Sequence, residues 1–153
     1  MQPSIPSSTY GKKISEGGRV LEFPGNTVIC RISPQSKQFH LLVRIRQQLK
    51  AQPWAEKFFF LPPSSYHMTV FEGVCDQVRQ PERWTVKLPL DAKLEEVDTF
   101  FVEAWKDVKK PSTIEMSYFR MKTSSTLGLA LLPSSPGMES DVRAFRDACS
   151  AAF

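Results

Sequence analysis

The residues YHMTVFEG at positions 66–73 predict a β-strand. β-Branched and aromatic residues, which favour strands, alternate with polar ones, and we expect Gly73 to close the element. Because side chains point to opposite faces in turn along a strand, His67 and Thr69 should share one face, with Met68 and Val70 on the other. The apolar pair is expected to anchor the strand in the core and so to hold the imidazole and the hydroxyl rigidly.

The segment before this strand predicts a strand followed by a helix. Residues 26–33 (NTVICRIS) are rich in β-branched residues and lie between Pro24-Gly25 and Pro34. From Pro34 to about Lys50 the apolar spacing becomes helical, with Ser33 as the expected cap. The apolar side of this helix is predicted to hold Leu41, Leu42, Ile45 and Leu49, and His40 lies opposite it.

The segments after these elements complete an alternation of strands and helices. The aromatic run Phe58–Leu61 is expected to be extended and buried, and residues 94–108 have the spacing of an amphipathic helix. Strands are predicted at about 113–121 and 126–132, joined by residues 122–125, and a last helix begins near Glu139. Hairpin-like strands with helices that cover one sheet face predict an α+β, antiparallel-rich fold.

Length and composition place the chain among globular proteins. Its 153 residues correspond to one domain, with 41% hydrophobic and 24% charged residues, which excludes wholesale disorder. We expect residues 1–22 to form an N-terminal arm, partly mobile, and residues 23–153 to form a single α+β domain. No run approaches the ~18 apolar residues of a membrane span, so no membrane partner is expected.

The N-terminus and the cysteines favour a cytoplasmic protein. The first residues, MQPSIPSS, lack the basic start and apolar core of a secretory signal. Cys30, Cys75 and Cys149 are an odd number at wide spacings, which favours free thiols over disulfides or a zinc site. No metal and no cofactor is predicted. The formal net charge of +4 is compatible with an anionic ligand without demonstrating one.

The pair His67 and Thr69 is the one constellation that carries chemistry. Two strand residues separated by one have Cα atoms about 6.6 Å apart, so both side chains can reach one phosphate. The imidazole can transfer a proton near neutral pH, and the hydroxyl can donate a hydrogen bond to a non-bridging oxygen. The alternative is a structural histidine hydrogen-bonded on a sheet surface in a plain interaction domain.

The order of elements around this motif resembles the two-histidine phosphoesterase superfamily, which includes cyclic phosphodiesterases. The residues that carry the resemblance are 24–30 as first strand, the helix from Pro34 and, above all, Tyr66–Gly73. The resemblance covers about residues 22–153. It implies a bilobed fold with one His-x-Thr motif in each lobe, in which one histidine is general base, the other general acid, and the threonines bind phosphate oxygens. It also implies metal-independent hydrolysis of a cyclic phosphate, a small nucleotide or an RNA end.

The sequence departs from this family in one respect, because it holds a single His-x-Thr. The only other histidine, His40, is followed by Leu41-Leu42 and lies on the polar face of a helix. The last helix lacks a stop signal before Phe153, so we expect a chain that lacks its C-terminal strands. Three explanations fit a single His-x-Thr motif. The chain lacks a C-terminal segment, or a second chain completes the site, or the protein is a degenerate member that binds without catalysis. We expect the chain alone to be weakly active or inactive.

Two further residues are candidate substrate contacts. Phe71 shares the face of His67 in a regular strand and could stack on a base, although core packing is the alternative. Arg31 could hold a phosphate, or could be an ordinary surface arginine. The Phe58–Phe60 run is interpreted as core and not as a stacking platform. The competing function is a non-catalytic nucleotide- or RNA-binding module that uses the same cleft.

Overall fold

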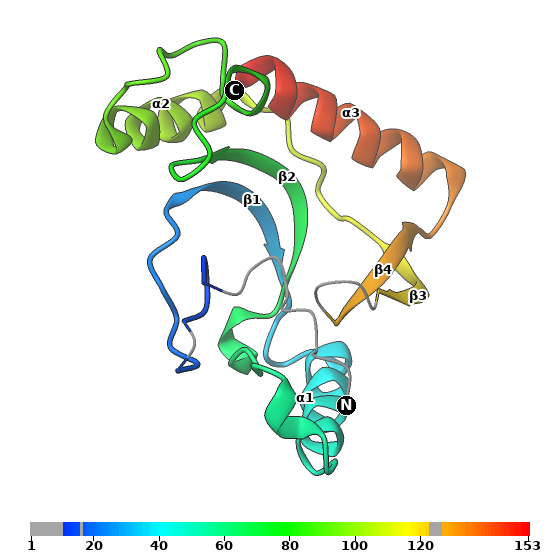
Figure 1. Cartoon of the computed structure of the whole chain (residues 1–153). Coiled ribbons are helices and arrows are strands. Elements are labelled where there is room, and N and C mark those ends of the chain that lie inside the picture. The colour runs from blue at the N-terminus through cyan, green and yellow to red at the C-terminus, as the bar shows by residue number, and fades with distance from the viewer. Residues whose placement is uncertain (1–10, 16, 123–126) are drawn as a thin grey trace. The chain divides into compact units, whose positions relative to one another are not determined.

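A computed structural model describes residues 11–15, 17–122 and 127–153 (Figure 1). The elements in chain order are β1 (Gly25–Arg31), α1 (Lys37–Lys50), the short 3-10 helices η1 (Ala55–Lys57) and η2 (Pro63–Ser65), β2 (His67–Cys75), the 3-10 helix η3 (Pro81–Arg83), α2 (Leu94–Asp107), β3 (Met116–Lys122), β4 (Gly128–Pro133) and α3 (Pro136–Ala152). This order of strands and helices confirms the predicted α+β class. The connection predicted at residues 122–125 lies mostly outside the described residues.

The strands form two sheets of two strands each, β1 with β2 and β3 with β4. The Ile32 N–H donates to the Tyr66 carbonyl at one end of the first pair, and the Asp76 N–H donates to the Pro24 carbonyl at the other, so the strands run in opposite directions. The second pair is antiparallel, with Tyr118 opposite Leu131, and its register shifts between Tyr118 and Arg120. The predicted antiparallel pairing is therefore confirmed.

The chain divides into two compact units, one of residues 27–72 and the other of residues 1–26 with 73–153. The second of these contains a core built on α2 and α3. Val97 and Cys149 are fully buried there, and the Phe101 ring stacks on Phe153 with ring centroids 4.6 Å apart. Apolar side chains at helical spacing on both helices supply this core, as the periodicity of residues 94–108 predicts.

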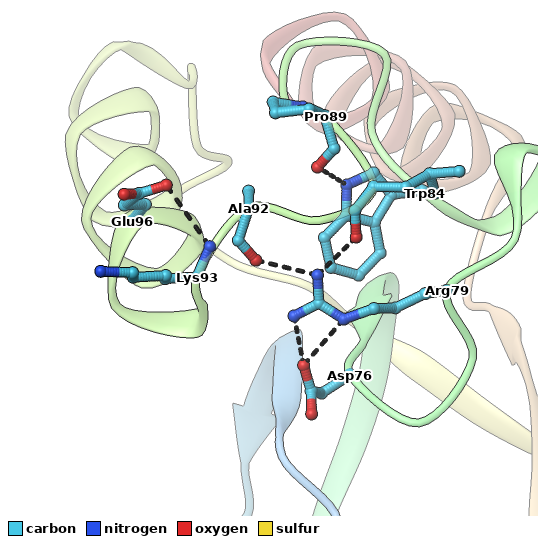
Figure 2. Close-up of polar contacts among 8 residues, drawn as sticks. Asp76, Arg79, Trp84, Pro89, Ala92, Lys93 and Glu96 are labelled. Atoms are coloured by element: carbon cyan, nitrogen blue, oxygen red, sulfur yellow. Dashed lines mark hydrogen bonds and ion pairs between the residues drawn. The ribbon is translucent and has the colours of Figure 1, made fainter.

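A single arginine holds the long connection between β2 and α2 (Figure 2). The Arg79 guanidinium bonds the Asp76 carboxylate and donates to the Ala92 carbonyl at 2.8 Å. It also lies over the Trp84 ring, 4.6 Å from its centroid, and the Trp84 indole N–H donates to the Pro89 carbonyl at 3.1 Å. The connection is thus ordered by side-chain bonds to backbone carbonyls that have no sheet or helix partner.

The unit of residues 27–72 differs from the sequence-based picture at α1 and after it. Ser36, and not Ser33, caps the helix, because the Ser36 hydroxyl accepts from the Phe39 N–H at 3.1 Å while residues 33–36 form a turn. Leu41 is 47% exposed and does not join the apolar side. The prediction that Phe58–Leu61 is buried is also wrong: Phe58, Phe59 and Leu61 are all exposed, and only Phe60 is half-buried.

The end of β2 and the start of α3 differ from the predicted bounds. Gly73 does not end β2, which continues to Cys75. The absence of a side chain there lets the strand approach the Asn26 carbonyl and the Phe101 ring closely. The last helix begins at Pro136 and not near Glu139, because proline suits the first helical position and the Ser135 hydroxyl accepts a hydrogen bond from the Met138 N–H.

None of the described helices is long and apolar enough to cross a membrane.

Candidate functional site

Strand β2 presents the two candidate groups on its exposed side. His67 and Thr69 are both exposed, whereas Met68 is half-buried and Val70 is 6% exposed. The alternation arises because the extended backbone turns successive side chains to opposite faces, and the apolar set determines which face turns inward. An imidazole and a hydroxyl therefore share the accessible face of one anchored strand.

The His67 ring has one nitrogen engaged. Nδ1 lies 2.6 Å from the Ser65 carbonyl oxygen. A carbonyl oxygen can only accept a hydrogen bond, so Nδ1 carries the proton in this contact. In the neutral ring the proton-free nitrogen is then Nε2, the atom that can accept a proton from water or a hydroxyl.

The other two candidate residues lie on the same pair of strands. Arg31 is exposed and is the last residue of β1, and its neighbour Ile32 donates to the carbonyl of Tyr66, which precedes His67. The end of β1 thus lies beside the start of β2, and Arg31 joins no ion pair among the residues with a described placement. Phe71 is half-buried, in keeping with partial packing of its ring.

The second histidine of the chain lies elsewhere. His40 is exposed on α1, and its ring meets Phe39 edge-on with centroids 6.0 Å apart. It belongs to no strand and has no threonine two residues on. His40 therefore does not form a second His-x-Thr motif.

Among the described residues, the cysteines and acidic side chains form no further centre. All three cysteines are free, and burial raises the pKa of the Cys30 thiol and of the Cys149 thiol, the latter opposed in part by the charge of Lys110. A raised pKa keeps a thiol protonated and unreactive. Across residues 11–15, 17–122 and 127–153, no three His, Cys, Asp or Glu side chains gather as metal ligands would.

One part of the site was not found from the sequence. The Ser65 carbonyl that fixes the His67 ring belongs to η2, a 3-10 turn formed by Pro63–Ser65. The signal that could have found it is the run Pro62-Pro63-Ser64-Ser65 directly before the strand, since two prolines restrict the backbone and favour a tight turn.

Comparisons with known proteins give one family and one similar structure. A family model named for 2H-phosphodiesterases, described as a domain of unknown function (DUF1868), matches residues 13–127. A crystal structure of a conserved protein of unknown function from Agrobacterium tumefaciens strain C58 is 28% identical in sequence, with a TM-score of 0.88. The similarity covers 99% of this chain and 64% of that one, so the chain spans less than two thirds of its neighbour's length. No curated protein matches the chain.

Proposed function

The chain belongs to the 2H-phosphodiesterase family described as DUF1868, and we propose that it is a phosphodiester hydrolase in which His67 and Thr69 act on one phosphate. The proposed substrate is a cyclic phosphate, a small nucleotide or an RNA end. The observation that carries the proposal is the exposed His67 and Thr69 pair on one face of β2, with Nδ1 of His67 bonded to the Ser65 carbonyl.

Each of the two groups has a defined task in this reaction. Hydrolysis of a cyclic phosphate adds a water oxygen to phosphorus and breaks one phosphorus–ribose oxygen bond. Nε2 of His67 takes the proton from the water, or returns one to the leaving ribose oxygen, and the net result is addition of one water. The Thr69 hydroxyl donates a hydrogen bond to a non-bridging oxygen, where negative charge builds up. Arg31 and Phe71 are proposed as contacts to the phosphate and the base.

The second proton transfer needs a partner that the 153 residues do not supply as a His-x-Thr. We propose that a second such motif, from another segment or a second chain, forms the other lobe of a bilobed site. Loss of one general acid or base costs typically 10²–10⁴ in rate. The 153-residue chain by itself is therefore expected to turn over cyclic nucleotides slowly.

Added imidazole can test this proposal on the chain as it is. Free imidazole in the buffer can take the place of the absent proton-transfer partner, so hydrolysis of 2′,3′-cyclic AMP should rise with imidazole concentration beyond the protein-free rate. Product formation is followed by chromatography. A protein that binds the nucleotide but never exceeds the protein-free rate, at any imidazole concentration, would instead be a non-catalytic nucleotide- or RNA-binding module.

A further inference from the structure

A single peptide unit before β2 makes two hydrogen bonds in opposite directions. The Tyr66 N–H donates to the Pro63 carbonyl at 3.0 Å, and the carbonyl of the same peptide, that of Ser65, accepts from Nδ1 of His67 at 2.6 Å. Because the peptide group is planar, fixing the direction of its N–H also fixes the direction of its carbonyl. The turn, and not the imidazole, therefore sets the direction in which the Ser65 carbonyl points.

The turn that sets this direction is itself restrained. The Ser65 N–H donates to the Pro62 carbonyl at 3.0 Å, and the Ser65 hydroxyl donates to the same oxygen at 2.7 Å. Pro62 has φ of −66°. The rings of Pro62 and Pro63 each allow little change in the φ angle of their own residue. The backbone therefore loses little conformational entropy when the carbonyl is held in place.

Three contacts tie this turn to the rest of its unit. The Tyr66 ring packs on Phe39 of α1 with centroids 5.8 Å apart, and the Tyr66 carbonyl accepts from Ile32 at 3.2 Å. Nε of Arg46, also on α1, donates to the Leu61 carbonyl at 3.1 Å. The segment that carries the Ser65 carbonyl is thus held by both the helix and the neighbouring strand.

We propose that the turn Pro62–Ser65 is a positioning device for His67. It keeps the proton of the neutral ring on Nδ1 and leaves Nε2 as the nitrogen that exchanges a proton with substrate or water. The significance for catalysis rests on the proposed function, whereas the position of the proton does not. Pro62, Pro63 and Ser65 act through His67 and do not touch the substrate.

Nitrogen-15 NMR of the full 153-residue chain reads the proton position directly. At a pH where the ring is neutral, long-range proton–nitrogen correlations of His67 should show a protonated Nδ1 and a bare Nε2. Pro63→Gly, which frees the backbone, and Ser65→Ala, which removes the hydroxyl bond to Pro62, should give averaged signals of both tautomers. Ser64→Ala is the matched control, because the Ser64 side chain is exposed and makes no hydrogen bond within the described residues.

The kinetic readout separates positioning from simple destabilisation. In the imidazole-dependent assay, Pro63→Gly and Ser65→Ala should lower kcat about tenfold with KM unchanged, as for other groups that orient a functional imidazole. A proton on Nε2 of the wild-type ring, or an unchanged tautomer and rate in both variants, would overturn the positioning device. If the wild-type chain shows the predicted tautomer but no imidazole-dependent hydrolysis, the proposed function is overturned and the positioning of the ring is confirmed.

Discussion

Replacing His67 with glutamine should lower the imidazole-dependent hydrolysis of 2′,3′-cyclic AMP by a factor of about 10²–10⁴. Glutamine is polar and similar in reach, so an exposed residue of β2 can accept it without loss of the fold. Its amide cannot exchange a proton near neutral pH, whereas an imidazole can. The loss should therefore fall on kcat, measured at saturating nucleotide.

His40→Gln is the matched control for this variant. His40 is also exposed and is the only other histidine, but it lies on α1 and outside any His-x-Thr. Its replacement should leave the rate within about twofold of the wild type, since single exposed substitutions away from a site have small effects. Equal losses in the two variants, or no loss in His67→Gln, would remove His67 from the reaction.

Replacing Gly73 with alanine should lower the free energy of unfolding by about 3 kcal/mol, the upper part of the range for overpacked sites. A Cβ at this position would lie 2.8 Å from the Asn26 carbonyl oxygen and 2.8 Å from Cε1 of Phe101. The first neighbour is backbone of the paired strand and the second belongs to a ring that is 8% exposed, so neither can move freely. Urea unfolding followed by circular dichroism measures the change.

Gly128→Ala provides the comparison for this loss. Gly128 is also a strand residue, at the start of β4, and a Cβ there would meet no atom within 4 Å. The substitution should leave stability unchanged or raise it by up to about 1 kcal/mol, because alanine reduces the entropy of the unfolded chain. If Gly73→Ala is as stable as Gly128→Ala, the close approach of Gly73 to Asn26 and Phe101 is wrong.

The elements with a clear hydrophobic period could be predicted from the sequence. The helix expected at residues 94–108 is observed at Leu94–Asp107, and the strand expected at 26–33 is observed at Gly25–Arg31. The exposure of His67 and Thr69 against the burial of Val70 also follows from strand alternation. In each of these cases a local repeat carries the information.

Contacts between distant segments could not be predicted in the same way. Composition favoured burial of Phe58 and Phe59, but whether an aromatic run is covered depends on what packs against it from elsewhere, and both are exposed. Gly73 reads as a strand end from its type alone, although its small size serves a close approach to Asn26 and Phe101.

In the candidate site, too, local patterns could be predicted and the contacts that orient the residues could not. The exposure of His67 and Thr69 on one strand face follows from alternation along β2, but the proton position on His67 depends on the direction of the Ser65 carbonyl. That direction is set by hydrogen bonds within η2, and a propensity for a turn does not specify where each carbonyl points. The residue types are thus visible in the sequence, whereas the orientation of the His67 ring depends on hydrogen bonds of the folded chain.

If His67 and Thr69 bind one phosphate together, both should respond to an NMR titration with a nucleoside 2′-phosphate. The side-chain signals of His67 and the amide and methyl signals of Thr69 should shift together along one saturable curve, with the His40 signals as an internal reference. A saturable titration in which the His67 and Thr69 signals stay in place, or follow two different dissociation constants, would contradict the shared phosphate site.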